Sequence, residues 1–533
     1  LRNSVLSLGT DDTGKAEQAF AESELTWGKT GVSAALYIDQ AQKLQVQGGI
    51  LLDGTKTAAS AEANKASFAD GSLLIVNGSG IGTSGTAALT GGSGSTLTVN
   101  QGAKLYLTST NAGTYTIAKG FANTTIDGWS WSADAAAVDV SVNKLSEIEK
   151  IEKNTADGDF TVTVRQTDVQ KKYDGIALPN ILQAMDQSRT EYAGIKYLTD
   201  LANDNKLDKE GFIAAVNSFA QGAENSGATR TGALAALDLG TAVQEHLSLA
   251  KAAAEQSGGF GKAAVDTADN GGIWAQYIHN KDKVDNMGGV SYDGQYNGVI
   301  IGGDFTDRGK YSSGIAFSYG SGDSTGSASK NEFDFWGLSY YGGIQNGDTN
   351  LIFDVAYSKT SSDVKGVIKA EPDTQVISMG IKGEKVISNG HGTSYVPYAG
   401  LRYMNIDTDS YNGSIDGKTA AHYSTDKADL WLLPVGISIS HESVTAGGWK
   451  VRPTADIAYV WTLGDKNTAM DITVPGVNAT DRLGYDIMDS GFFVGKLGLE
   501  AEKGDWTYGL GYACQKGSHA QNSKFMLNVT YSF

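Results

Sequence analysis

From Gly272 to the C-terminus, apolar residues recur at every second position in segments bounded by Gly, Asn and Asp. We count twelve such segments, from GGIWAQYIHNK to KFMLNVTYSF. This period predicts β-strands, whose successive side chains point to opposite faces of a sheet. In the third segment Ile315, Phe317 and Tyr319 alternate with small residues, which separates the two faces clearly. The first and fourth segments carry bulky residues on both faces, so the orientation of these two stays open.

The connections between the segments indicate how the strands are arranged. Those that follow even-numbered segments are short, such as TDRGK and IQNGD, whereas those that follow odd-numbered segments are long, such as DTDSYNGSIDGKTAAHYS. Short turns at one end and long loops at the other are typical of outer-membrane β-barrels. Closure into a barrel also removes the free edges of the sheet. We therefore expect a mainly β protein whose residues 270–533 form a twelve-stranded transmembrane barrel, with its apolar face toward lipid.

Residues 178–269 show a helical period instead. ALPNILQAMDQSRTEYAGIKYLTDLA predicts one helix with Pro179 in its first turn, and EGFIAAVNSFAQGA predicts a second. The Ala-rich segment 229–256 predicts a third helix, which at 1.5 Å per residue would be roughly 40 Å long, about the thickness of a membrane. Polar residues interrupt its apolar runs, namely Asp238, Gln244, Glu245, His246 and Lys251. We therefore expect this helix to lie in a water-lined pore rather than in lipid.

Residues 1–177 contain short strand-like runs, such as ADGSLLIVNGSG and GSTLTVNQGAKLYLTS, each followed by a turn with Gly or Asn. This pattern is typical of a parallel β-helix or solenoid, in which each coil buries its apolar face on the next. A β-sandwich is the alternative. Trp129 and Trp131 are expected to be core or cap residues of this region.

Composition narrows the possible functions. The net charge of −18 argues against a nucleic-acid partner, because phosphates require a basic surface. The single cysteine, Cys514, excludes an intramolecular disulfide and suits a chain that crosses an oxidising compartment. No apolar run is long enough for a transmembrane helix. Because the sequence opens with LRNSV, without a signal peptide, we expect it to be a piece of a longer precursor.

Motifs for catalysis, cofactors or metals are weak. GDSTG (322–326) contains Ser324 but lacks the strand-then-helix order of a nucleophile elbow. GSGIGTSG (78–85) resembles a phosphate loop in composition, but no Lys follows it and we expect no helix to begin there. The six His residues show no metal-binding spacing, and DNKLDKEG (204–211) fits a polar helix–helix turn better than a calcium loop. We therefore expect no enzyme, no cofactor and no metal site.

Charged residues on the inner faces of the expected strands form the main candidate site. The set comprises Asp304, Asp354, Arg402, Arg452, Asp456, Lys496 and Glu500. Such charges form salt bridges with one another, or they contact a helix in the pore. A role in cleaving that helix is the further alternative, but the helix lacks the Asn-Asn pair that some self-cleaving proteins use.

The whole arrangement resembles that of monomeric (type Va) autotransporters. LPNILQAMDQ and AVNSFAQGAENSGATRTGALAALD resemble the stretch that precedes the barrel of this family, and GGIWAQYIHNK resembles its first strand. The resemblance covers residues 178–533, and residues 1–165 only in style. It implies an outer-membrane protein that exports its own N-terminal passenger and anchors it at the cell surface. The passenger would be adhesin-like, with a host or cell-surface ligand.

The last strand carries a further expectation from this resemblance. It ends on an aromatic residue, like the signal by which the barrel-assembly machinery recognises its substrates, and its apolar face comprises Phe525, Leu527, Val529, Tyr531 and Phe533. The expected partners are outer-membrane lipid, this machinery and periplasmic chaperones, and the protein is expected to be a monomer. Two alternatives remain: a passenger enzyme (protease or esterase) whose catalytic part lies upstream, and a general porin.

Overall fold

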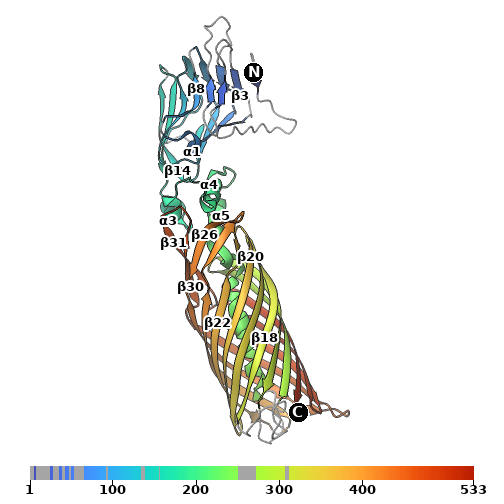
Figure 1. The fold of residues 1–533 in the computed structure, drawn as a ribbon. Helices are drawn as coiled ribbons and strands as arrows, with labels where there is room; N and C mark the ends of the chain where they lie inside the picture. Colours follow the sequence, from blue (N-terminus) through green and yellow to red (C-terminus); the bar gives the residue numbers. More distant parts are fainter. Residues whose placement is uncertain are drawn as a thin grey trace. The chain divides into compact units, whose positions relative to one another are not determined.

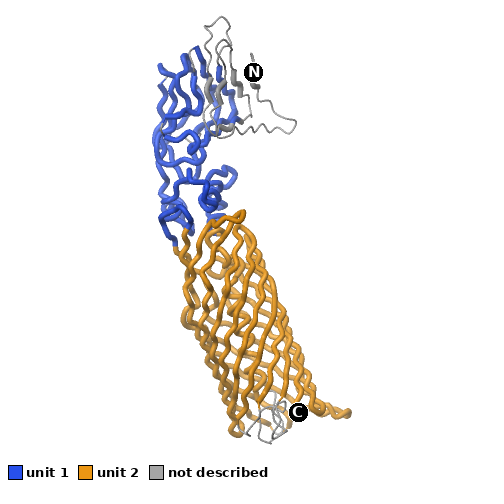
Figure 2. Tube along the Cα trace, in the orientation of Figure 1, with its two compact units in different colours: residues 1–217, 474–481 blue, residues 218–473, 482–533 orange. Residues whose placement is uncertain are grey.

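The structure is a computed structural model of the 533-residue chain. It describes residues 5–7, 25–27, 35–38, 43–46, 50–52, 65–83, 85–91, 94–133, 138–154, 156–249, 272–305, 311–389 and 391–532. The chain divides into two compact units, one of residues 1–217 and 474–481, the other of residues 218–473 and 482–533 (Figure 2). Within the described residues, no helix has the length and apolar character needed to cross a membrane.

Most strands of unit 1 are parallel and lie in three sheets, because each turn of the chain contributes one strand to each sheet in succession. The first sheet contains β1 (Val5–Ser7), β3 (Ala35–Ile38), β6 (Lys65–Phe68), β9 (Thr96–Val99) and β12 (Asn123–Ile126). The second contains β4 (Lys43–Val46), β7 (Leu73–Asn77), β10 (Lys104–Thr108) and β13 (Val140–Val142). The third contains β2 (Leu25–Trp27), β5 (Ile50–Leu52), β8 (Ala87–Gly91), β11 (Gly113–Lys119), β14 (Ser146–Asn154) and β15 (Asp159–Gln166). This winding is the solenoid architecture that the turn-punctuated sequence predicts.

Alternate residues of these strands fill the interior of unit 1. Leu74, Leu97 and Leu105 are fully buried there. Trp129 is also fully buried, and its ring packs against those of Phe68 and Phe160 at centroid distances of 5.1 and 5.3 Å. The parallel stack ends in an antiparallel hairpin, because β15 pairs with β11 and β14 in the opposite direction. The hairpin thus covers the last parallel strand of this sheet.

Two expectations for unit 1 need correction. A single helical turn, α1 (Gly78–Ile81), does begin in GSGIGTSG, because the side chain of Asn77 accepts a hydrogen bond from the Ser79 amide. The expected single helix after residue 178 is two helices, α3 (Pro179–Ala184) and α4 (Ala193–Asn203). The helix stops at Met185, where ψ is 126°, and the Asp186 carboxylate then accepts bonds from the Ser188 amide and hydroxyl. Asp and Ser favour such turns over a continuing helix. The remaining helices before the barrel are α2 (Val169–Lys172) and α5 (Lys209–Gln221), and the turn DNKLDKEG leads into α5.

Residues 474–481 belong to unit 1, although they are far from it in sequence. Leu178 cannot cap α3 with its side chain, and Pro179 has no amide hydrogen. The Asp481 carboxylate supplies the cap instead, accepting hydrogen bonds from the Asn180 and Ile181 amides at 3.1 and 2.8 Å. A carboxylate at this end of a helix is favoured by the unpaired amides and by the helix dipole.

Unit 2 contains a closed antiparallel barrel, shown with α6 (Ala228–His246) running inside it in Figure 1. Within the described residues it has the twelve expected spanning strands, which are β16 (Gly272–Met287), β17 (Val290–Asp304), β18 (Tyr311–Gly326), β19 (Ser329–Asn346), β20 (Thr349–Gly366), β22 (Asp373–Lys385), β24 (Thr393–Thr408), β27 (Ala428–His441), β29 (Lys450–Gly464), β32 (Gly491–Lys503), β33 (Trp506–Lys516) and β34 (Ala520–Ser532). The first and last close the ring, with Gly272 opposite Ser532. The prediction of a twelve-stranded barrel is confirmed.

The two faces of the barrel strands follow the sequence alternation. Ile315, Phe317 and Tyr319 are exposed on the outside, as are Ile301 and Leu338. The two ambiguous segments are resolved by the strand pairing. In β16 and β19 the aromatic residues Trp274, Phe333, Phe335 and Tyr341 point inward and are buried. Bulky residues occur on both faces of these strands because the inner face packs against the helix in the lumen, α6.

The long connections expected between strands are largely strands themselves. β16 runs on to Met287 and β17 begins at Val290, so only Gly288 and Gly289 join them. Further short strands continue the wall, namely β21 (Lys369–Ala370), β25 (Tyr411–Ile415), β26 (Lys418–Thr425), β30 (Asn467–Thr473) and β31 (Thr480–Asp486), whereas β23 (Ile387–Ser388) and β28 (Ser443–Val444) lie at the other end. The expectation of open loops is therefore wrong for these segments. They are strands because β26 pairs with both β25 and β30, and because Ala421 and Ile472 are buried.

Candidate functional site: the lumen and its helix

The lumenal helix α6 is built from small residues that let it approach the barrel wall closely. Almost every residue from Ala228 to Val243 is buried. A Cβ atom at Gly240 would lie 2.1 Å from Nη1 of Arg402, and one at Gly232 would lie 2.7 Å from Thr374. Larger side chains at these positions would therefore push the helix away from the strands. The predicted helix 229–256 agrees with α6 over most of its length, and its last residues lie outside the described part of the chain.

The helix is preceded by a tight turn, the 3-10 helix η1 (Gly222–Ser226). Both flanking glycines, Gly222 and Gly227, have positive φ values of 56° and 70°. A Cβ atom at Gly227 would lie 2.1 Å from the Tyr292 ring, so this position requires glycine for its space as well as its backbone. The Tyr411 hydroxyl accepts a bond from the Ala223 amide, and the Tyr423 hydroxyl donates to the Phe219 carbonyl. Tyrosines of the wall thus hold the chain where it enters the lumen.

Ser324, the serine of GDSTG, lies in β18 and faces this turn. It is fully buried, and its hydroxyl donates a 2.6 Å hydrogen bond to the Ser226 carbonyl. Asn225 is fixed beside it, with its side-chain oxygen accepting from the Ala328 amide. Ser324 therefore holds η1 in place by a hydrogen bond that already uses its hydroxyl proton.

Three ion pairs join α6 to the strands. Arg230 makes a bidentate pair with Asp282, with distances of 2.9 and 3.1 Å, and also donates to the Ile487 carbonyl. Asp238 pairs with Lys524 and accepts a 2.6 Å hydrogen bond from Tyr296. Glu245 pairs with Lys496. The Arg230 and Asp282 side chains are only 8% and 6% exposed, so this pair is isolated from solvent.

The end of α6 is held by a second cluster. His246 lies 2.9 Å from the Asp304 carboxylate and stacks on Trp274, with ring centroids 4.7 Å apart. Just beyond the helix, Glu384 accepts hydrogen bonds from the Ser248 hydroxyl and the Leu249 amide. These contacts fix the point at which the chain leaves the helix.

Glu224 is the one titratable group of η1, and its carboxylate is fully buried. It accepts hydrogen bonds from the Thr229 hydroxyl and amide at 2.7 and 3.3 Å. The Thr229 hydroxyl that donates to it also lies within hydrogen-bond distance of the hydroxyls of Thr408, the last residue of β24, and Tyr485 of β31. Burial raises the pKa of Glu224 to about 7, and the hydrogen bonds from Thr229 offset only part of this effect.

The inner-face charges named from the sequence fall into two groups. Lys496 reaches the helix directly, and Arg402 reaches it through Asp354, which binds Arg402 at 2.8 Å and accepts from Gln244. Asp304 also contacts the helix, through His246. The remaining charges bind within the wall: Arg452 pairs with Glu442 and Glu500, and Asp456 accepts hydrogen bonds from Tyr398 and Ser438. Both alternatives, contacts to a helix and salt bridges within the wall, thus occur side by side.

Sequence reasoning missed several wall residues that hold the helix. Asp282, Lys524 and Glu384 were not singled out, nor were the inward aromatic residues Trp274 and Tyr296. Asp282 and Lys524 lie on the neighbouring strands β16 and β34, two residues out of register, because Asp282 is opposite Asn522 and Asn280 is opposite Lys524.

The final strand lies as its alternation predicts. Phe525 and Leu527 are exposed on the outer face, with Val529 and Tyr531 partly exposed, and Lys524 and Thr530 are buried on the inner face. Phe533 lies outside the described residues. Cys514 is exposed on the neighbouring strand β33. In the part of the chain that the structure describes, no group of His, Cys, Asp or Glu residues is arranged to bind a metal.

A family model described as "Autotransporter beta-domain" matches residues 273–513. The barrel of this chain is an autotransporter β-domain. The autotransporter acts as an outer-membrane translocator whose passenger is exported to the cell surface. Its surroundings are therefore outer-membrane lipid on the outside and its own chain on the inside. The barrel family is not a family of enzymes.

Solved structures with a similar fold include three autotransporter domains. The translocator domain of autotransporter NalP from Neisseria meningitidis is 13% identical, with 58% of this chain and 99% of that one covered and a TM-score of 0.44. The β-domain of the Bordetella autotransporter BrkA is 16% identical, with 50% and 100% covered and a TM-score of 0.40. The transport unit of AIDA-I from Escherichia coli is 13% identical, with 55% and 98% covered and a TM-score of 0.36. No curated protein matches the chain.

Proposed function

We propose that residues 1–177 are the C-terminal part of a β-solenoid passenger with an adhesin-like function, that 178–269 are the linker and pore helix, and that 270–533 are the translocator. The observation that carries this division is α6. It runs inside the barrel and continues through η1 and α5 into the chain of unit 1. A chain threaded through its own barrel in this way connects the translocator to what it has exported. A general porin has no need for a helix pinned across its lumen by three ion pairs.

The outer faces of the parallel sheets support an adhesive passenger. In the first sheet Ser67, Thr98 and Thr125 lie side by side across β6, β9 and β12, on the face opposite the core. In the third sheet the Thr114 and Thr163 hydroxyls lie 2.9 Å apart. A flat row of hydroxyl groups on a rigid ladder offers hydrogen bonds to a ligand at a small cost in conformational entropy. The proposed ligand is a glycan or protein of a host or neighbouring cell surface.

Protease shaving of intact cells tests the surface passenger. Cells that produce the complete protein are treated with protease outside, and an epitope within residues 101–133 is followed by immunoblot, together with one in the turn at 347–348. The first epitope should disappear and the second should persist. Protection of residues 101–133 while another surface protein is cut would refute the proposal.

Adhesion is tested by substitutions that leave the core untouched. Thr98→Lys together with Thr125→Lys places two charges in the outer row and should reduce retention of cells on immobilised mucin. Gln101→Lys together with Gln170→Lys is the matched control for two added charges, because both residues are exposed and lie outside the sheets. Equal retention by cells with and without the passenger would refute the adhesin proposal and favour the second candidate, a passenger whose enzyme lies upstream of residue 1.

Assembly is proposed to depend on the barrel-assembly machinery and periplasmic chaperones, with Phe525, Leu527, Val529, Tyr531 and Phe533 as the signal, and the product is proposed to be a monomer. The support is chemical. Until it is inserted, the barrel exposes apolar strand faces that aggregate in water. Every spanning strand has two partners in the closed ring, so no strand edge is left for a second copy.

A further inference from the structure

The two sides of the lumen differ in the size of their inward residues. On the side of β16–β20, Trp274, Ile300, Tyr341 and Ile352 pack against Leu239 and Val243 of α6 and against Leu247, which follows the helix. On the side of β29 and β32–β34 the inward positions are small, among them Thr454, Gly498, Gly509, Gly511 and Ala513. The lumenal helix therefore lies against one side of the barrel and leaves space on the other.

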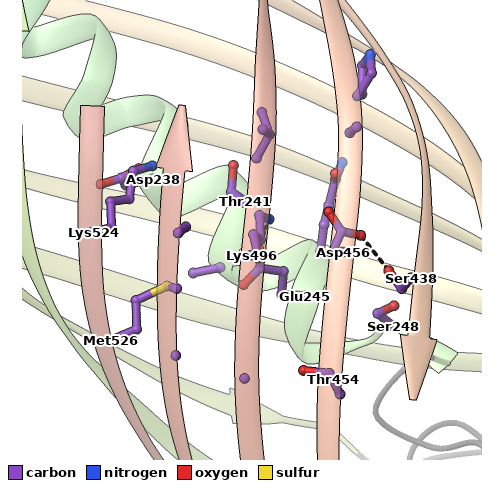
Figure 3. A pocket seen from close by; sticks show the side chains of 18 of the residues that line it. Asp238, Thr241, Glu245, Ser248, Ser438, Thr454, Asp456, Lys496, Lys524 and Met526 are labelled. Carbon is purple, nitrogen blue, oxygen red and sulfur yellow. Dashed lines mark hydrogen bonds and ion pairs between the residues drawn. The ribbon is translucent and has the colours of Figure 1, made fainter. Parts of the chain in front are cut away.

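That space is a cavity of about 220 Å3, shown in Figure 3 between α6 and the strands that carry Lys524, Lys496 and Asp456. One water molecule needs roughly 10–15 Å3 of such space. Asp238, Thr241, Glu245 and Ser248 of the chain around the end of α6 point toward it, and the wall adds Thr454, Asp456, Lys496 and Asn528. Apolar side chains such as Ile278 and Val460 make up much of the remaining lining, and the charged and hydroxyl groups among them give water the partners it needs in a cavity of this size.

The cavity narrows toward the start of the helix. Its lining begins at Leu237 and extends beyond the helix end to Ser248. Toward the helix start there follows a space of only about 20 Å3, lined by Arg230, Leu234, Phe492 and Asn522. Here Arg230 spans from the helix to Asp282 and to the Ile487 carbonyl. Beyond it, η1 is enclosed by Tyr292, Tyr411 and Tyr423.

The order of the passenger and α6 along the chain shows which end of the cavity faces the cell surface. The passenger lies at the cell surface, and α6 begins on the passenger side, so Ala228 is at the surface end of the helix and His246 at the periplasmic end. We propose that the lumen beside the second half of α6 is a water-filled vestibule open to the periplasm, and that the described part of the pore is sealed in its surface half, between Arg230 and η1. Small ions and solutes enter the vestibule up to Lys524 and stop there.

Cysteine accessibility tests this proposal in the full chain. Cys514 is first changed to Ser, because it is exposed on the outside. Thr454→Cys then places a thiol in the vestibule, whereas Ala356→Cys places one on the side where α6 packs against the wall. The probe is a small trimethylammonium methanethiosulfonate, and labelling is followed by mass spectrometry on protein that shows the heat-modifiable mobility of a folded barrel. Thr454→Cys should react many-fold faster than Ala356→Cys.

The position of the seal is tested in planar bilayers, with the reagent added to one side at a time. Proteolysis identifies the side on which the passenger lies. Thr454→Cys should be modified only from the opposite side, and Arg230→Ala should remove this asymmetry. Gly511→Cys serves if Thr454→Cys does not fold, because its Cβ atom would meet only the flexible end of Met526. Equal reactivity of the two thiols would overturn the vestibule, and modification from the passenger side in the unaltered seal would overturn its location.

Discussion

Removing Arg230 should release the lumenal helix from the surface half of the barrel. In Arg230→Ala the Asp282 carboxylate keeps only a long contact of 3.5 Å to Asn522, and the Ile487 carbonyl loses its donor. Asp282 and Ile487 are both buried, so bulk solvent does not replace the guanidinium. The perturbation therefore leaves a buried negative charge without a counter-charge as long as the helix stays in place.

The size of the effect follows from this burial. Removing one partner of a buried ion pair costs about 3–5 kcal/mol, whereas an exposed pair contributes about 0–1 kcal/mol. Because about 1.4 kcal/mol corresponds to a tenfold change in an equilibrium constant, the ratio of open to sealed pores should rise by roughly two to four orders of magnitude. Arg482 is the control, because it is paired with the Asp426 and Asp471 carboxylates but its side chain is 53% exposed.

The assay is single-channel recording of the full chain in planar bilayers. Arg230→Ala should show frequent open events, Arg482→Ala should behave like the unaltered protein, and Arg230→Met with Asp282→Leu should restore the sealed state, because the pair is replaced by apolar groups of similar size. If Arg230→Ala keeps the open probability of the unaltered protein, the seal does not depend on this pair and the reasoning fails.

Three other predictions can be checked independently. Deleting Phe533 should sharply reduce the amount of barrel in the outer membrane, yet barrel refolded in detergent should remain heat-modifiable, because a single aromatic side chain contributes only about 1–3 kcal/mol. Phe317→Ser, which removes an outward aromatic ring from β18, is the control, and normal outer-membrane levels of the deletion would contradict the assembly role. The open probability should increase from pH 5 to pH 8. The reason is that the pKa of Glu224 in the sealed state is raised from 4.5 to about 7, so the sealed state binds a proton that is lost over this range. Glu224→Gln should abolish the increase, and a pH response that survives in this variant would assign it to another group. An epitope at the turn 416–417 should bind antibody on intact cells and one at 347–348 should not, and the reverse result would invert the orientation of the barrel.

The strands could be predicted from the sequence because their outer face must be continuous in its apolar character. Each of the twelve segments was located by alternation alone, and the side chains that separate clearly, such as Phe317 and Tyr319, lie outside as expected. The ends of the strands could not be predicted. Beyond the lipid band the outer face becomes polar, so KVDNMGGVSYDG reads as a loop although nearly all of it is paired strand. Hydrogen bonding between neighbouring strands, which the sequence does not display, decides their length.

The ends of the helices, like those of the strands, could not all be predicted from the sequence. The Ala-rich composition of α6 indicated a helix too polar for lipid, which was sufficient to place it in a pore. The break between α3 and α4 was missed, because Gln187 and Asp186 fit a helical period as well as a turn. Gln187 instead donates to the Thr110 carbonyl and accepts from Asn143 inside unit 1. A buried network from a distant part of the chain overrides a local preference of a few tenths of a kcal/mol per residue.

The candidate site was predictable by residue type but not by pairing. Arg402 and Arg452 both occupy inner positions of neighbouring parts of the wall, and nothing in their local sequence distinguishes them. Arg402 binds Asp354 under the helix, and Arg452 binds Glu442 and Glu500 in the wall. The difference comes from where the helix lies, and that position is set by the size of residues on β16–β20 against those on β32–β34. The aromatic residues that made two segments ambiguous are therefore the same residues that decide which charges meet the helix and which side of the lumen stays open.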